Sequence, residues 1–252
     1  MTPPTLTRVY SDAQTAALYD LMYPWDPERW PGDKFYDELV MAAESVLDVG
    51  CGTGAMLHRA RERGHAGRLV GLDPDRDALD RARRRTDVEW LEGTAAEAAW
   101  RAEFDLVTMA SNTFQCLITD DDVRASLAAI RAAIRADGRF AFETRHPQAR
   151  AWETWTPADA SDVVDADGRA LRVWNETESV VGDVATVTET IAEPDGTVLR
   201  VGRAQLRFLD PPALAAFLAE AGFAVEAQYG DWSRVPVNDQ SRTIITIALG
   251  AE

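Results

Sequence analysis

An acid, a glycine-dense turn and a second acid form the most informative group of residues in this chain. Residues 46–54 read VLDVGCGTG, and Asp73 follows nineteen residues after Gly54 at the end of a second apolar run, RLVGLD. Glycines let the backbone turn tightly and approach a ligand closely. The helix expected after the turn would direct unpaired N–H groups at that ligand. Because Asp73 can accept both hydroxyls of a ribose, we predict a nucleotide site here.

With this pattern the chain resembles the class I S-adenosylmethionine (SAM)-dependent methyltransferases, over about residues 40–145 and 211–250. The resemblance implies SAM as cofactor, with backbone amides of the turn on its tail carboxylate and Asp48 with Ser111 on its tail ammonium. It also implies Asp73 on the ribose and Pro74 over one adenine face. The expected cofactor contacts are Asp48, Gly50, Cys51, Gly52, Thr53, Gly54, Asp73, Pro74, Gly93, Thr94, Ala95 and Ser111.

The chain departs from the family pattern at the end of the third predicted strand. Many family members have Gly-Asp-Ala there, with the Asp accepting from the adenine amino group, whereas this chain has Gly93-Thr94-Ala95. A threonine hydroxyl is a weaker acceptor than a carboxylate. We therefore expect backbone groups and water to hold the adenine.

Two alternatives remain at this point. Gly50, Gly52 and Ala55 also satisfy the dinucleotide pattern G-x-G-x-x-G/A, so an NAD-dependent oxidoreductase is the first. Three features argue against an oxidoreductase. An acid lies two positions before the first glycine, a long segment precedes the first strand, and the C-terminal segment lacks the His or Tyr/Lys usual in hydride transfer. The second is a protein with the SAM-binding fold that does not transfer methyl groups.

Composition limits the possible partners and the chemistry. The chain has 252 residues, is 46% hydrophobic and carries a formal net charge of −16, which disfavours nucleic acid and anionic membranes as partners. The best basic cluster, Arg81 with Arg83–Arg85, is expected to be the solvated end of a helix. Lys34 is the only lysine, so Schiff-base chemistry is nearly excluded.

Other features bear on the location and source of the protein. Cys51 and Cys116 are the only cysteines, which indicates no disulfide framework. The N-terminal residues lack an apolar stretch of signal-peptide length, and no run approaches 18 apolar residues. We expect a cytoplasmic protein, and the Arg- and Ala-rich composition suggests a bacterial source.

The alternation of strands and helices predicts a parallel α/β sheet covered on both faces, and the resemblance implies a doubly wound, mostly parallel sheet of seven strands. An antiparallel β insertion is expected after the fifth strand. We expect a helical cap over residues 1–44, a SAM-binding core over 45–146, the insertion over 147–209, and the C-terminal part of the core over 210–252. The first five strands are predicted near 45–49, 68–73, 87–92, 104–110 and 138–143. Helices are predicted near 11–23, 34–44, 54–64, 75–85, 94–101, 121–136 and 211–221, insertion strands near 171–180, 184–193 and 198–209, and two final strands near 223–229 and 242–249.

Candidates for catalysis and acceptor binding lie at the predicted strand ends and in the cap. The segment LYDLMY resembles the cap of small-molecule methyltransferases, which implies that Tyr19 lies near the sulfonium; core packing is the alternative. His146 is the candidate base, although a turn-capping role is an equal alternative. The candidate acceptor contacts are Tyr23, Asn112, Phe114, Arg145 and Trp232.

These observations lead to one functional hypothesis. We predict in-line transfer of a methyl group from SAM to a small-molecule acceptor, with nitrogen preferred to oxygen, because a neutral amine needs little beyond positioning. The segment SNTF lacks both prolines of the [DNS]-P-P-[YF] pattern of nucleic-acid amino-methyltransferases, which argues against a nucleic-acid acceptor. No metal site is evident in the sequence, and we expect a monomer or a homodimer.

Overall fold

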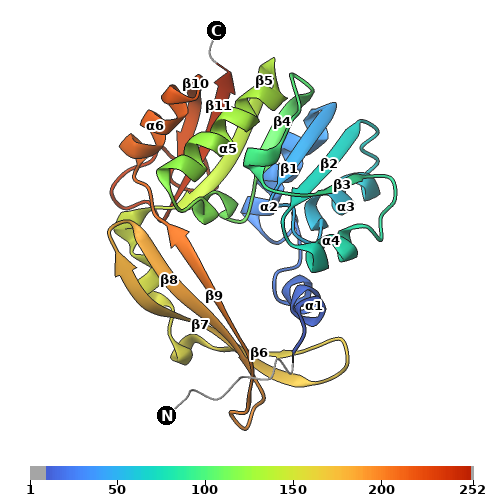
Figure 1. Cartoon of the computed structure of the whole chain (residues 1–252), viewed down its shortest axis with the longest axis vertical. Helices are drawn as coiled ribbons and strands as arrows, with labels where there is room; N and C mark the ends of the chain where they lie inside the picture. The colour runs from blue at the N-terminus through green and yellow to red at the C-terminus, as the bar shows by residue number, and fades with distance from the viewer. Residues whose placement is uncertain (1–9, 251–252) are drawn as a thin grey trace.

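A seven-stranded sheet and a separate four-stranded sheet make up the structure, a computed structural model in which residues 10–250 are described (Figure 1). The larger sheet has the strand order β10-β11-β5-β4-β1-β2-β3. Its strands run parallel except for β11, which is antiparallel to both of its neighbours. The predicted fold is thereby confirmed. The strands are β1 (Ser45–Val49), β2 (Arg68–Asp73), β3 (Glu89–Glu92), β4 (Phe104–Met109), β5 (Ile134–Arg145), β10 (Phe223–Tyr229) and β11 (Thr243–Gly250).

Helices cover both faces of this sheet and bury two apolar clusters. On one face, α5 and α6 pack over side chains such as Val107 and Phe140. On the other face, α2 and α3 pack over side chains such as Val46 and Ala141. Unbroken apolar strands such as β1, buried along its whole length, follow from this double cover. The helices are α1 (Asp12–Met22), α2 (Pro31–Ala42), α3 (Ala55–Glu62), α4 (Arg76–Ala82), α5 (Asp120–Ala133) and α6 (Pro211–Glu220).

Local capping chemistry sets several helix boundaries. Ser11 and Gln14 form a capping box at the start of α1, and Thr119 and Asp122 form one at the start of α5. The prediction of a helix near 94–101 was wrong, because only the 3₁₀ turn Ala95–Glu97 forms there. After this turn the chain extends toward β4, which lets Trp100 pack edge-on against the Phe104 ring at 5.4 Å between centroids.

The smaller sheet is antiparallel, with strand order β6-β7-β8-β9. Its strands are β6 (Ser161–Val164), β7 (Ala170–Val181), β8 (Val184–Ala192) and β9 (Val198–Arg207). The last three confirm the predicted insertion strands. The first was not predicted, and residues 161–164 pair with β7 and extend the sheet by one strand. The predicted division at residues 44, 146 and 209 stays a prediction.

Helix α1 lies between the two sheets (Figure 1). Leu18 on α1 is buried against Val173 and Ile191 of the smaller sheet. At the start of the helix, Arg200 of β9 forms an ion pair with Asp12 at 2.5 Å. The cap helix therefore packs on the inserted sheet through both apolar and charged contacts.

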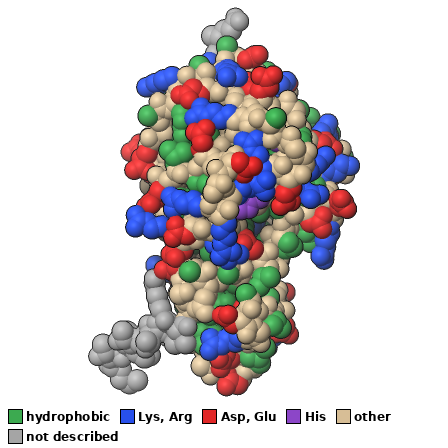
Figure 2. Space-filling view, turned by 90° about the vertical axis from the view of Figure 1, so that its right-hand side faces the viewer, with side chains coloured by type: hydrophobic (Ala, Val, Ile, Leu, Met, Phe, Trp, Pro, Cys, Tyr) green, Lys and Arg blue, Asp and Glu red, His purple; other side chains and the backbone are tan. Residues whose placement is uncertain are grey.

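The surface carries charges of both signs. On the face shown in Figure 2, Lys and Arg side chains are interspersed with Asp and Glu side chains. No helix within residues 10–250 has both the length and the apolar character needed to cross a membrane.

We predict that Leu18→Ala loosens the docking of α1 on the smaller sheet. Removing a buried leucine side chain and leaving a cavity costs about 2–5 kcal/mol. Hydrogen exchange should therefore accelerate in α1 and in the facing strands, while the strands of the larger sheet keep their protection. The control is Leu21→Ala, because Leu21 lies on the same helix but is 49% exposed. Equal protection in both variants would contradict the packing described here.

Candidate functional site

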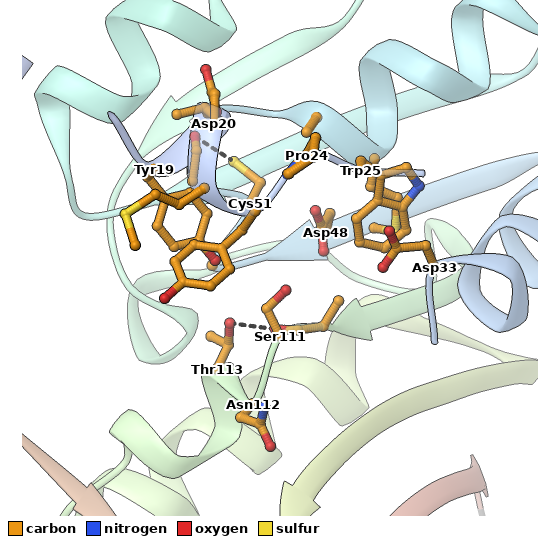
Figure 3. Close-up of a pocket in the computed structure, with 18 of the residues that line it drawn as sticks. Tyr19, Asp20, Pro24, Trp25, Asp33, Asp48, Cys51, Ser111, Asn112 and Thr113 are labelled. Atoms are coloured by element: carbon orange, nitrogen blue, oxygen red, sulfur yellow. Dashed lines mark hydrogen bonds between the residues drawn. The ribbon is translucent and has the colours of Figure 1, made fainter. Parts of the chain in front are cut away.

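A cavity of about 640 Å³ opens at the carboxyl ends of β1 and β4, beneath the cap (Figure 3). This is the edge of a doubly wound sheet where ligands bind, at the point where the strand order reverses. Its lining comes from α1 and the loop after it, from the start of α2, from the turns after β1 and β4, from the end of β5, and from Glu189 within β8. The predicted residues in this lining are Tyr19, Tyr23, Asp48, Gly50, Cys51, Gly52, Thr53, Ser111, Asn112 and Arg145.

Glycine is required in the turn after β1 for two physical reasons. Gly50, Gly52 and Gly54 all have positive φ angles, of 74°, 53° and 79°. In addition, a side chain at Gly50 would overlap the side chain of Thr113 in the turn after β4. Gly54 precedes α3 without a side-chain cap, so the first amides of the helix are available to an anionic group.

Two buried carboxyl groups lie at the sheet edge beneath the cavity. Asp48 accepts a hydrogen bond from Thr108 Oγ1 at 2.8 Å, and burial raises its pKa to about 7 despite that bond. Glu143 accepts hydrogen bonds from the Tyr36 hydroxyl and, at 2.8 Å, from the Asn112 backbone amide. Burial likewise raises the pKa of Glu143 to about 7. A cation in the cavity would favour the ionised form of both groups.

Asp73 stands at the end of β2, beside the glycine turn, as the sequence predicts. Its two oxygens accept hydrogen bonds from the Gly52 and Asp75 amides, both at 2.7 Å. A carboxylate oxygen has a second lone pair, so these bonds leave acceptor sites for a ribose diol. Asp73 is nearly buried and lies just outside the lining of the cavity.

The remaining predicted cofactor contacts also lie outside that lining. Gly54 directly precedes α3, and a side chain added to it would meet the Trp90 ring. Pro74, Gly93, Thr94 and Ala95 follow the neighbouring ends of β2 and β3. The Thr94 hydroxyl and amide both donate to Glu97, which fixes the turn after β3.

Asp20 ties the cap to the nucleotide-binding turn, and our sequence analysis did not identify it. Its carboxylate accepts from the Thr53 hydroxyl and forms two bonds with the Arg81 guanidinium, at 2.6 and 2.9 Å. Arg81, expected at a solvated helix end, is instead largely buried in this contact, with 22% of its side chain exposed. Asp20 directly follows Tyr19, so these bonds also restrain that tyrosine. Figure 3 shows Tyr19 and Asp20 on the cap side of the cavity.

The predicted acceptor residues divide into two groups. Tyr23, Asn112 and Arg145 line the cavity, and Arg145 is held by Gln115 Oε1 at 2.9 Å. The guanidinium of Arg145 also lies 5.3 Å from the centre of the Trp155 ring.

The second group lies outside the cavity lining. Phe114 is buried and stacks on Phe142, and Trp232 packs beside Phe35. His146 is buried, and its Nδ1 accepts a hydrogen bond from the Gln148 amide at 3.2 Å. Burial also lowers the pKa of His146.

Several other cavity residues were missed by sequence reasoning. Trp25, Trp30 and Asp33 line it from the loop after α1 and the start of α2, and Glu189 lines it from β8. The aromatic loop was visible in the sequence as WDPERW, but nothing local indicated where it would pack. No cluster of three or more potential metal ligands occurs among residues 10–250.

Comparisons with known proteins agree with this geometry. A methyltransferase-domain family model matches residues 46–138. The cypemycin N-terminal methyltransferase of a Streptomyces species is 28% identical over 217 residues, covering 81% of this chain and 82% of that protein. The structure of DesVI from Streptomyces venezuelae superposes with a TM-score of 0.68 at 25% identity, covering 94% and 98% of the two chains.

A second solved structure is similar in fold. It is that of SAM-bound CalS10, an amino pentose methyltransferase from Micromonospora echinaspora. It gives a TM-score of 0.68 at 22% identity, over 93% of this chain and 97% of that one. The nucleotide-binding turn, the strand order and these similarities agree, and they favour methyl transfer over NAD-dependent redox chemistry. Residues 46–138 carry a methyltransferase domain, and the protein is a SAM-dependent methyltransferase that uses SAM as its cofactor.

Proposed function

We propose that this methyltransferase transfers the methyl group of SAM to a nitrogen atom of a small-molecule amine. The observation that carries the proposal is the cavity, which runs from the glycine turn to Arg145 and Glu189 and is covered by the cap. Its volume lies within the range of about 300–1,000 Å³ that is typical of small-molecule sites. Support for nitrogen comes from the names of similar proteins, which include an N-terminal methyltransferase and an amino pentose methyltransferase.

We assign the cofactor-binding residues by the chemistry of each part of SAM. The amides around Gly52 and the start of α3 suit the tail carboxylate, while Asp48 and Ser111 suit the tail ammonium. Asp73 suits the ribose, and Pro74 with residues 93–95 suits the adenine. The bound cofactor supplies a methyl group that its sulfonium has already activated.

In this proposal the protein mainly positions the reactants and excludes water. Tyr19 and Tyr23 lie next to each other on the cap, with ring centroids 5.1 Å apart, and their aromatic faces suit a cationic sulfonium. Asn112 and Arg145, at the strand ends of the larger sheet, then orient the acceptor. Such positioning can contribute roughly 7–11 kcal/mol to catalysis.

His146 remains a candidate base for an acceptor that must lose a proton. Its Nδ1 already accepts from Gln148, so only Nε2 is free to take a proton in this arrangement. Because it also lies outside the cavity lining, a hydroxyl acceptor is less well served than an amine. This favours nitrogen over oxygen.

The other parts of the proposal concern partners. The net charge of −16 opposes binding of nucleic acid, so we propose a free small molecule as acceptor and no nucleic-acid partner. A monomer or a homodimer is proposed as the assembly.

The proposal is tested by incubating the protein with isotopically labelled SAM and a panel of amines, each matched to its hydroxyl analogue. Mass spectrometry should detect the gain of one labelled methylene unit on at least one amine and not on its hydroxyl counterpart. Transfer to oxygen alone, or to none of the panel while SAM binds, would count against N-methylation.

We predict that Asp20→Asn weakens SAM binding about fivefold. The substitution removes the charge that pairs with Arg81 while keeping an oxygen for the Thr53 hydroxyl. Charged hydrogen bonds contribute about 1.5–3 kcal/mol, and partial exposure of both partners reduces this to roughly 1 kcal/mol. Isothermal titration calorimetry measures the change. Asp80→Asn is the control, because it breaks the exposed ion pair with Arg83 on the same helix; equal effects of the two variants would refute the assignment.

We also predict that SAM affinity rises as the pH increases from about 6 to 8. Burial raises the pKa of Asp48 and Glu143 to about 7, so both groups ionise over this range and then attract the cationic cofactor. The same shifts affect folding. Between about pH 4 and 7 the carboxyl groups of Asp48 and Glu143 are ionised in the unfolded chain but still protonated in the folded one, so the stability of the protein without SAM should fall as the pH rises.

Calorimetry in buffers of different ionisation enthalpy should detect proton release when SAM binds near pH 6.5. Asp48→Asn should reduce that release and flatten the pH dependence. An affinity that is constant from pH 6 to 8 in the unmodified protein would contradict the role of these carboxyl groups.

A further inference from the structure

One charged residue interrupts an apolar face of the inserted sheet. On β8 the side chains of Ala185, Val187, Glu189 and Ile191 alternate along one face of the sheet. Ile191 belongs to the apolar cluster around Leu18 of α1, and Ala185 and Val187 belong to a second cluster around Phe208. Glu189 lies between the two clusters. A carboxylate is the least favourable choice for such a position unless it has a partner.

The neighbouring strands leave space beside this carboxylate. Glu189 is paired in register with Asn175 of β7 and with Gly202 of β9. A methyl group added at Gly202 would touch only one backbone oxygen, at 3.9 Å. Across the three strands, the residues in register are therefore polar Asn175, acidic Glu189 and Gly202, which has no side chain. They lie between the two apolar clusters. This composition fits a binding surface better than a packed interior.

Glu189 has no hydrogen bond or ion pair within 4 Å from any residue between 10 and 250. Arg200 is the cation that acts on it electrostatically, but the guanidinium of Arg200 is already engaged by Asp12 at 2.5 Å. Burial raises the pKa of Glu189, as expected for a carboxylate that has lost water without gaining a partner. The missing partner is therefore a cation or a proton.

The cavity places this carboxylate opposite the methyl-transfer machinery. Glu189 lines the same cavity as the glycine turn and Ser111. Tyr23 lies within electrostatic range of both Glu189 and Arg145, which places all three at the end of the cavity formed by the cap and the inserted sheet.

We propose that Glu189 binds the ammonium group of the amine acceptor inside the cavity, so that the inserted sheet selects the acceptor by charge. This rests on the proposed N-methylation and adds the residue that recognises the substrate class. Before attack, the nitrogen gives one proton to the Glu189 carboxylate: an N–H bond breaks and an O–H bond forms. The freed lone pair then forms the N–C bond while the C–S bond breaks and its electron pair stays on sulfur.

The first test needs no knowledge of the natural acceptor. Sinefungin is a SAM analogue that carries an amine where SAM carries its methyl group, and S-adenosylhomocysteine lacks both. Calorimetry gives the ratio of their dissociation constants for the unmodified protein, for Glu189→Gln and for Glu176→Gln. Glu176 is the matched control, because it lies on β7 of the same sheet but is exposed.

We expect Glu189→Gln to reduce the preference for sinefungin at least about fivefold, since it removes a charge near the amine at unchanged volume. Affinity for S-adenosylhomocysteine should stay within about twofold, and Glu176→Gln should change neither value. An unchanged preference in Glu189→Gln would overturn the proposal. If the unmodified protein bound neither ligand, the assignment of the cofactor site itself would fail, which is a different result.

A second test uses whichever amine the labelled-SAM panel identifies. Glu189→Gln should raise KM for that amine and lower kcat/KM at least about tenfold, as expected for loss of a charged hydrogen bond. Glu189→Asp should recover part of the loss, because it restores the charge. If kcat/KM for that amine were the same in the unmodified protein, in Glu189→Gln and in Glu189→Asp, the inserted sheet would not recognise the charge of the acceptor.

Discussion

The close approach of two turns is the constraint on which the site depends. The turn after β1 and the turn after β4 meet where the strand order of the larger sheet reverses, and Gly50 leaves no room for a side chain beside Thr113. Because these turns are packed together, the first amides of α3, Asp48 and Ser111 face one space. The positive φ angles of the glycines fix the backbone path that makes this possible. The cavity is thus a consequence of sheet topology combined with one short glycine-rich segment.

Buried acids give this space its electrostatic character. Asp48 and Glu143 lie on β1 and β5, the two neighbours of β4, and each has hydrogen-bond donors but no ion pair within 4 Å among residues 10–250. Burying carboxyl groups without such partners costs stability, and their raised pKa values express that cost. A cationic cofactor supplies the missing charge. Burying these acids therefore lowers the stability of the protein without SAM, and pairing them with the cationic cofactor contributes to the free energy of binding.

The cap and the inserted sheet complete the enclosure. Helix α1 buries Leu18 against the inserted sheet and holds the larger sheet through Asp20, so one helix connects both parts. This arrangement places Tyr19 and Tyr23 on the cap side and Glu189 on the sheet side of one cavity. Residues proposed to bind the cofactor and the acceptor thus share the cap and the turn after β4, while Glu189 comes from the inserted sheet.

The sequence by itself determined the nucleotide-binding turn, the alternation of strands and helices, and the antiparallel character of residues 171–209, because each is encoded in local spacing. Tertiary structure alone decided which side chains share the cavity. It buried Phe114 in the core and put His146 outside the cavity lining, although both follow strand ends, because the rotation of a side chain at a strand end depends on its packing. It also joined Asp20 to Arg81 across 61 positions and turned Glu189 inward. No local pattern reports such contacts, since they arise only when distant elements pack together.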